Sequence, residues 1–441
     1  MILRQLVDAG LGCASYLVAD EQARVAAVVD PAYAIEPYLD AAEREELKLE
    51  RVLETHTHAD HLSGHGRIAL ERGCPVAIHR AAEVAYEHEP LEDATEVAIG
   101  DVRIRVLHAP GHRPEHCAFL VLDERGAAKA VLTGDSLFVG EAARPDLAVG
   151  AREGAEGLFH SLRHLAELDE DVEVLPGHVA GSLCGSGMST KHSTTIGFEK
   201  KFNRALQFGS VAEFVDAYGS PAQLRPPNTE RIVALNRGPF VGAPPELAEL
   251  SGSGDATILD VRDAEAFAAG HAHGAINVPV DGSMFATKAA FLIGPQEPIA
   301  IHAAAHEQAE RAARGLRSVA LLELAGYVTQ PPADEHVDAV ALADLATLLE
   351  RGEVEVLDVR EKDERDDGYI PGTRHVPYRL LRATGAGVDG ERPVVTICNT
   401  GARAAIAASV LNAAGVEARP VLHGGVATWP GQKVEFRRCG S

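Results

Sequence analysis

The sequence predicts a multidomain α/β protein with domains at residues 1–235, 246–331 and 337–441. In the first domain, short runs with β-strand character alternate with runs that have helical apolar spacing. Behind a stretch rich in Pro and Gly, the segment ILDVR at 258–262 recurs 98 positions later as VLDVR at 356–360. A repeat of that length fits two copies of a small α/β domain.

Size and composition narrow the possible functions. At 441 residues the length favours about three domains. The formal net charge of -24, without any basic block, argues against nucleic acid as a partner. We find no apolar run approaching the roughly 18 residues that suggest a membrane span, and the N-terminus has the pattern of a first strand rather than a signal peptide. Six scattered cysteines form no disulfide framework, so we expect a cytoplasmic protein.

The elements of the first domain follow from apolar patterning. Strand candidates are 25–29, 52–53, 76–78, 102–107, 119–122, 130–132 and 172–175, and helix candidates are 36–46, 67–71 and 157–167. A trailing helix and a linker are expected over about 206–245, where Gly and Pro become frequent.

Histidine and aspartate follow four of these strands directly. The polar segments are 55–61 (THTHADH), 108–112 (HAPGH), 133–135 (TGD) and 176–178 (PGH). A sandwich of sheets whose loops gather at one edge would bring them together. Neutral imidazoles and carboxylates are ligands for a divalent metal, whereas a histidine-rich surface loop would not need the three distant segments.

This pattern resembles the metal site of the metallo-β-lactamase superfamily. The resemblance rests on the order T-H-x-H-x-D-H plus three distant ligands, and it covers about residues 1–205. The matching residues are His56, His58, Asp60, His61, His112, Asp135 and His178. It implies an αββα sandwich with the metal between the edges of the two sheets.

Two branches of that superfamily keep all seven residues: dinuclear zinc hydrolases of the glyoxalase II type and mononuclear iron persulfide dioxygenases. Segments 12–16 (GCASY), 134–140 (GDSLFVG) with 144–147 (RPDL), and 193–200 (STTIGFEK) look like the dioxygenases. The helical substrate domain that ends glyoxalase II is absent, and the repeat stands in its place.

The dioxygenase resemblance implies one Fe(II) per chain, held by His56, His112 and Asp135, with open positions for the substrate sulfur and O2. His58, Asp60, His61 and His178 would then support these ligands or, in the alternative with two zinc ions, form a second site.

Three further residues are substrate-binding candidates: Arg144, Asp146 and Cys184. Arg144 would pair with a carboxylate of the thiol carrier, and Asp146 would fix its loop. A structural ion pair for Arg144 and an incidental buried cysteine at Cys184 are the alternatives.

The second copy of the repeat carries a cysteine between a buried strand and a helix. Residues 394–397 (VVTI) lead into 398–403 (CNTGAR), and an alanine-rich helix follows. Backbone N–H groups and the helix dipole favour the thiolate of Cys398, and Arg403 adds a cation. This segment resembles the rhodanese family, whose loop cysteine carries a sulfane sulfur. Four residues separate Cys398 from Arg403, whereas related phosphatases have five; a purely structural cysteine is the alternative.

The first copy departs from the rhodanese pattern. Its corresponding strand, 298–301, leads into HAAAH at 302–306 and contains no cysteine. We therefore expect residues 246–331 to be an inactive rhodanese domain that holds the geometry between the active units.

Together these features resemble persulfide dioxygenase–rhodanese fusion proteins of hydrogen sulfide metabolism. The expected partners are glutathione persulfide or another low-molecular-weight persulfide, O2, and sulfite or thiosulfate, and we expect a homo-oligomer. One rival is a zinc thioester hydrolase with a sulfur-transfer tail. A second is a non-enzymatic persulfide sensor or delivery scaffold.

Overall fold

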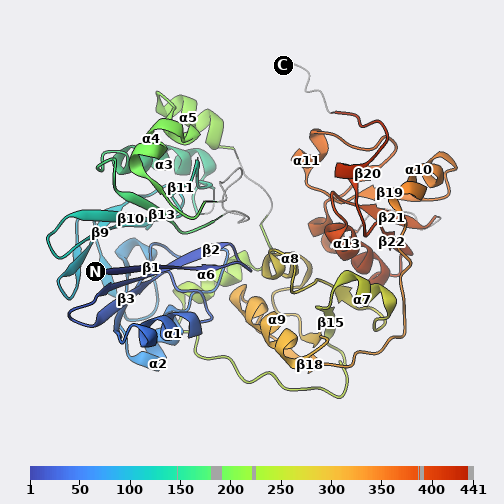
Figure 1. The fold of residues 1–441 in the computed structure, drawn as a ribbon, viewed down its shortest axis with the longest axis horizontal. Helices are drawn as coiled ribbons and strands as arrows, with labels where there is room; N and C mark the ends of the chain where they lie inside the picture. Colours follow the sequence, from blue (N-terminus) through green and yellow to red (C-terminus); the bar gives the residue numbers. More distant parts are fainter. Residues whose placement is uncertain (147, 180–190, 221–224, 386, 388–391, 436–441) are drawn as a thin grey trace. The chain divides into compact units, whose positions relative to one another are not determined.

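The computed structural model describes residues 1–146, 148–179, 191–220, 225–385, 387 and 392–435. By their internal contacts these residues form two compact units. Unit 1 comprises Met1–Pro245 with Arg317–Ala320, and unit 2 comprises Glu246–Leu316 and Leu321–Ser441 (Figure 1). Within the described ranges, no helix is both long enough and apolar enough to cross a membrane.

Unit 1 contains two six-stranded sheets. The first, in spatial order, is β1 (Ile2–Asp8), β2 (Cys13–Asp20), β3 (Val25–Val29), β4 (Lys48–Leu53), β5 (Val76–His79) and β6 (Glu89–Leu91). The second is β14 (Thr194–Thr195), β13 (Glu173–Pro176), β10 (Ala128–Gly134), β9 (Cys117–Leu122), β8 (Val102–His108) and β7 (Glu96–Ile99). Its helices are α1 (Glu36–Arg44), α2 (His65–Arg72), α3 (Ala151–Leu165), α4 (Ile196–Phe202), α5 (Val211–Tyr218) and α6 (Thr229–Arg237).

Alternation along the strands builds the layers of unit 1. On β2, Tyr16 and Val18 enter a core shared with Phe119 of the second sheet. Leu17, their neighbour in sequence, points to the opposite face, into a core that contains Ile68 of α2. The outer face of the second sheet packs in the same way against α3 and α5. The result is the predicted αββα sandwich.

The predicted strands and helices correspond to elements of this sandwich, with differences at their ends. The strand expected at 25–29 is β3, and the helix expected at 157–167 is the C-terminal part of the longer α3, which begins at Ala151. Two helices, α5 and α6, occupy the segment expected to be a trailing helix and a linker.

Unit 2 contains the repeat as two four-stranded parallel sheets. The first has the order β16 (Ile276–Asn277), β15 (Thr257–Asp260), β17 (Ile299–His302) and β18 (Leu324–Val328). The second has the order β20 (Arg374–His375), β19 (Glu355–Asp358), β21 (Val394–Ile397) and β22 (Ala418–Pro420). Their helices include α7 (Ala264–Ala269), α8 (Phe285–Leu292), α9 (His306–Ser318), α10 (Leu342–Glu350), α11 (Lys362–Asp366), the 3-10 helix η3 (Tyr378–Leu380), α12 (Leu381–Thr384) and α13 (Ala402–Ala413).

The two copies pack on each other within unit 2. The backbone N–H of Asn277 in the first copy donates to Oγ of Ser409 on α13 of the second at 2.9 Å. Arg382 of the second copy forms an ion pair with Glu297 of the first. Because the two copies pack on each other, they form one compact unit, and the chain divides into two units. The three domains at residues 1–235, 246–331 and 337–441 remain an interpretation of the sequence.

Candidate functional sites

The metal-ligand candidates of unit 1 lie in loops at one edge of the sandwich. His56 follows β4, His112 follows β8 and Asp135 follows β10. All three side chains are buried, and their ligand atoms lie within 4.8 Å of one another. Oδ2 of Asp135 is 3.5 Å from Nε2 of His112 and 4.0 Å from Nε2 of His56. The structure thus brings together the three residues that the resemblance assigned to iron.

Hydrogen bonds fix which ring nitrogen of each histidine is available. Nδ1 of His112 donates to the carbonyl oxygen of Arg144 at 3.0 Å, since a carbonyl can only accept. The Thr55 hydroxyl donates to Asp30 at 2.8 Å, so its oxygen accepts from Nδ1 of His56 at 2.9 Å. Both histidines therefore present the lone pair of Nε2 to the space beside Asp135.

Charges and unpaired atoms at this cluster fit a divalent cation. Burial, and then repulsion from His58 and His112, lowers the pKa of His56 well below its usual value, and burial also lowers the pKa of His112. Among the described residues, Nε2 of His56 and Oδ2 of Asp135 are buried without a hydrogen-bond partner. Such unpaired groups are costly unless a ligand satisfies them. Two neutral imidazoles and a carboxylate suit Fe(II) or Zn²⁺.

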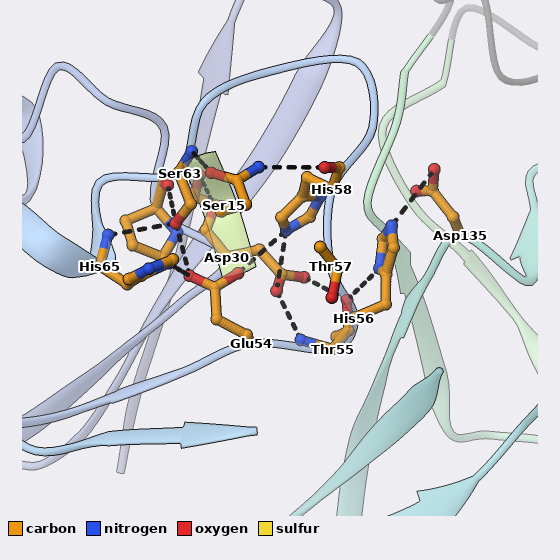
Figure 2. A network of polar contacts seen from close by, with 12 residues as sticks. Ser15, Asp30, Glu54, Thr55, His56, Thr57, His58, Ser63, His65 and Asp135 are labelled. Atoms are coloured by element: carbon orange, nitrogen blue, oxygen red, sulfur yellow. Dashed lines mark hydrogen bonds and ion pairs between the residues drawn. The ribbon is translucent and has the colours of Figure 1, made fainter. Parts of the chain in front are cut away.

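His58 is turned away from this cluster. Figure 2 shows His56 directed toward Asp135, whereas the His58 ring faces Asp30 and Glu54. Its Nε2 lies 3.3 Å from Oδ1 of Asp30 and 3.1 Å from Oε2 of Glu54. Burial opposes the charged ring, but these two carboxylates outweigh it and raise the pKa of His58 well above its usual value. Nε2 of His58 therefore faces Asp30 and Glu54 and not the cluster of His56, His112 and Asp135.

The remaining predicted residues form a chain of hydrogen bonds beside Asp135. His178 contacts Oδ1 of Asp135 through Nδ1 at 2.7 Å and Oδ2 of Asp60 through Nε2 at 2.8 Å. Burial would raise the pKa of Asp135, but His178 outweighs burial and lowers it. Nδ1 of His61 lies 3.2 Å from Oδ1 of Asp60. His58, Asp60 and His61 also have ligand atoms within 4.8 Å of one another, so they form a second group of potential ligands.

Sequence reasoning missed two residues that position this centre. Asn236, near the end of α6, donates to the carbonyl oxygens of His58 and His61 at 3.0 and 2.9 Å and accepts from the Ser63 N–H at 2.9 Å. His116 accepts from the Asp135 N–H at 2.9 Å, and burial lowers its pKa to about 3. Asn236 lies 175 residues beyond His61 and has no motif around it, so nothing in the sequence singles it out.

The predicted substrate-binding residues of unit 1 lie next to the centre or outside the described residues. Arg144 donates from Nε and Nη2 to the two carboxylate oxygens of Asp146 at 2.7 and 2.9 Å. Both side chains are 9% exposed, so this ion pair is largely shielded from water. Cys184 lies outside the described residues.

In unit 2, Cys398 directly follows β21, and α13 begins four residues later. Its Sγ is buried and accepts a hydrogen bond of 3.1 Å from the backbone N–H of Gly401. Gly401 has a φ of 106°, and a Cβ there would lie 1.9 Å from the carbonyl oxygen of Leu422. A glycine is therefore required for the loop to wrap around the sulfur.

Arg403 does not point freely at the sulfur, because it forms an ion pair with Glu364 on α11 through two hydrogen bonds. Nδ2 of Asn399 also donates to Glu364, at 2.8 Å. The glutamate thus ties both ends of the Cys398 loop to α11.

The first copy of the repeat has alanine where the second has Cys398. Strand pairing aligns Asp260 with His302 and Asp358 with Ile397, so Ala303 occupies the position of Cys398. His302 is buried, and within the described ranges neither of its ring nitrogens has a hydrogen-bond partner.

Comparisons with known proteins agree with this architecture. A model of the metallo-beta-lactamase superfamily matches residues 8–178, and a model of the rhodanese-like domain matches residues 243–330 and 341–432.

Among curated proteins, the uncharacterized protein ML0493 of Mycobacterium leprae is 32% identical over 45% of this chain and 94% of its own length. Persulfide dioxygenase ETHE1 of Bos taurus is 27% identical, over 56% of this chain and 91% of its own. Hydroxyacylglutathione hydrolase of Gloeobacter violaceus is 36% identical, over 37% and 62%. A crystal structure of a metallo-beta-lactamase from Staphylococcus aureus has a TM-score of 0.68 at 26% identity, covering 74% of this chain and 98% of that one.

Proposed function

Because the chain belongs to the metallo-beta-lactamase superfamily and carries two rhodanese-like domains, we propose that it is a bifunctional enzyme of sulfur metabolism. Unit 1 oxidises glutathione persulfide, or a similar thiol persulfide, to sulfite with O2. Cys398 of unit 2 transfers sulfane sulfur between persulfide or thiosulfate and sulfite or a thiol.

The dioxygenase activity proposed for unit 1 is supported by the different contacts that its histidines make. His56 and His112 offer their Nε2 lone pairs beside Asp135, while His58 lies between Asp30 and Glu54. His178 uses both nitrogens on Asp135 and Asp60. This arrangement favours one metal ion with three protein ligands over two ions that share all seven residues.

His56, His112 and Asp135 would hold the Fe(II), and such a two-histidine, one-carboxylate site with open positions supplies activation of O2 next to a bound sulfur. The overall reaction consumes R–S–SH, O2 and water and yields R–SH, sulfite and two protons. His178 orients the Asp135 carboxylate, and Asn236 fixes the loop that carries His56 to His61. Arg144, beside the centre, would contact the thiol carrier.

For the sulfurtransferase half, the position of Cys398 supports the assignment. The Gly401 N–H and the start of α13 both stabilise negative charge on Sγ. A persulfide on Sγ can then pass its outer sulfur to sulfite. A covalent link between the two activities raises the effective concentration of the shared sulfur species.

Hydrolysis of a thioester at two zinc ions is the second candidate, because the hydroxyacylglutathione hydrolase relative is 36% identical over 37% of this chain. Oxygen consumption by the full-length protein with glutathione persulfide separates the candidates. We expect oxygen uptake to be lost in Asp135→Ala and retained in Cys398→Ser. Conversion of sulfite to thiosulfate should be retained in Asp135→Ala and lost in Cys398→Ser. Absence of uptake would favour the hydrolase or a non-enzymatic carrier, and loss of both activities in Cys398→Ser would contradict two separate sites.

A further inference from the structure

A short hairpin connects two residues that set the metal centre of unit 1. It is formed by β11 (Leu137–Phe138) and β12 (Glu141–Ala142), which pair antiparallel. Asp135 lies two residues before β11. Arg144, whose carbonyl oxygen accepts from Nδ1 of His112, lies two residues after β12. The hairpin therefore carries one candidate ligand at its start and fixes the ring of a second at its end.

The middle of the hairpin also contacts the centre. The buried ring of Phe138 meets the ring of His178 edge to face, with centroids 6.0 Å apart and planes at 85°. His178 in turn contacts Oδ1 of Asp135 at 2.7 Å. The two ends of the hairpin are tied together, because the Ala143 N–H donates to the carbonyl oxygen of Ser136 at 3.0 Å. A displacement of the hairpin would thus reach Asp135 both along the chain and through His178.

Two side chains outside the hairpin hold its turn. Glu199 lies on α4 and Asn203 directly follows that helix, and both are buried. Oε2 of Glu199 accepts from the Gly140 N–H at 3.0 Å and from Nδ2 of Asn203 at 2.6 Å. Nδ2 of Asn203 also donates to the carbonyl oxygen of Glu141 at 3.0 Å. The backbone on both sides of the turn is therefore bound to one pair of side chains.

One carboxylate oxygen of Glu199 accounts for these contacts. Its other oxygen, Oε1, is buried and has no hydrogen-bond partner among the described residues. Burial of a polar group is costly unless its hydrogen bonds offset the loss of water. What Glu199 gives in return is its hold, through Oε2, on Gly140 and Asn203.

We propose that Glu199 is a positioning residue of the metal centre. By holding the turn of the hairpin it keeps Asp135 in place and, through the carbonyl oxygen of Arg144, the ring of His112. The inference rests on the metal site of the proposed function and not on the reaction proposed there. A carboxylate that is not a ligand would then govern how firmly the metal is held, as partners behind the ligands of other metal sites do.

Metal release measures this role without turnover. Full-length protein loaded with Co²⁺ is mixed with an excess of EDTA, and the visible absorption of bound Co²⁺ is followed over time. The variants are Glu199→Ala, Glu199→Gln and Asn203→Ala. In Glu199→Gln the amide oxygen can accept both hydrogen bonds of Oε2, and the amide nitrogen takes the position of the unpartnered Oε1.

Asp20→Ala is the matched control. Asp20 is also a buried carboxylate that holds a turn, because it accepts from the backbone N–H groups of Gln22 and Ala23 at 2.8 and 3.0 Å. It lies at the end of β2 opposite to Cys13, the residue that forms a β-bridge with His178. Its loss should destabilise unit 1 without moving the hairpin.

We expect Co²⁺ to be released about tenfold faster from Glu199→Ala than from wild type, with a shift of its visible absorption bands. Asn203→Ala should change in the same direction. Glu199→Gln should resemble wild type, and Asp20→Ala should keep both the release rate and the bands. Thermal unfolding of each variant sets a temperature at which all are folded.

Unchanged release and bands in Glu199→Ala would overturn the inference, and so would equal acceleration in Asp20→Ala, which reports general loss of stability. Release from Glu199→Gln as fast as from Glu199→Ala would also overturn it, because the hydrogen bonds would not be the cause. If Glu199→Ala did not fold, Asn203→Ala would decide in its place. Absence of oxygen uptake by the wild type with glutathione persulfide would refute the proposed function and leave the release rates to judge Glu199.

Discussion

Nδ1 of His112 donates a 3.0 Å hydrogen bond to the backbone carbonyl oxygen of Arg144. The contact joins a metal-ligand candidate to a substrate-binding candidate through an atom that no substitution at position 144 removes. The backbone of Arg144 sets the tautomer of His112, while the Arg144 side chain forms an ion pair with Asp146.

A change of the Arg144 side chain should therefore separate metal binding from substrate binding. In Arg144→Gln the iron content per chain should stay unchanged, because the carbonyl remains. The KM for glutathione persulfide should rise about tenfold, because a charged hydrogen bond to the carrier is lost. Arg152→Gln, at an exposed ion pair with Asp216, is the control. Loss of iron at an unchanged KM would assign Arg144 a purely structural role.

Asn236 should matter for metal retention although it is not a ligand. Asn236→Ala removes three buried hydrogen bonds from the loop of His58, His61 and Ser63. We expect the free energy of unfolding of unit 1 to fall by about 2–3 kcal/mol and iron to be lost to a chelator about tenfold faster. Asn412→Ala removes comparable contacts to Ala418 in unit 2 and should leave iron retention unchanged. Equal retention in both variants would contradict this role.

The orientation of His58 predicts the metal stoichiometry. Protein purified without oxygen should contain one iron per chain by elemental analysis. His58→Gln should keep this iron, whereas His112→Gln should lose it, because Nε2 of His112 lies beside Asp135 and Nε2 of His58 lies beside Glu54. Two zinc ions per chain, with one lost in His58→Gln, would instead support the hydrolase.

Gly401 should be indispensable for sulfur transfer. Gly401→Ala places a Cβ 1.9 Å from the carbonyl oxygen of Leu422 at a φ of 106°, which should cost at least about 2 kcal/mol and displace the Cys398 loop. Gly415→Ala is the control, because Gly415 also has a positive φ but faces open space. Fluorescence of the single tryptophan, Trp429, follows unfolding of the second copy. Equal activity of the two variants would refute the steric argument.

The pair of Glu364 and Arg403 should make the second copy sensitive to acid. Burial would raise the pKa of Glu364, but Arg403 outweighs burial and holds it below its usual value. The stabilisation is complete above the unfolded value of about 4.3 and is lost as the pH falls through the lower folded value. The pair is partly exposed, so we expect no more than about 1 kcal/mol. The thermal unfolding of wild type and Glu364→Gln, followed at Trp429, should differ at pH 6, and the difference should shrink as the pH falls below about 4. A constant difference would contradict the linkage.

The fold class could be predicted from the sequence alone. Apolar patterning marks the strands, and the repeated segment marks a duplicated α/β domain. The sequence also indicated which residues gather around Asp135, since polar segments that follow strands meet at one edge of the sandwich. It could not predict the direction of the His58 ring, which depends on Asp30, directly after β3, and Glu54, directly after β4, both lying close to its Nε2. It also could not predict Asn236, because an asparagine on a helix has no pattern that points to a distant loop.

Ala303, at the position of Cys398, leaves the first copy of the repeat free from one evolutionary constraint. A lone module must preserve a reactive loop and a substrate-selecting surface on the same stretch of chain, so a mutation that alters selectivity endangers reactivity. After a duplication, the second copy can keep the thiol loop fixed while the first copy accumulates changes. The surface of the first copy can then change with no substitution near the nucleophile.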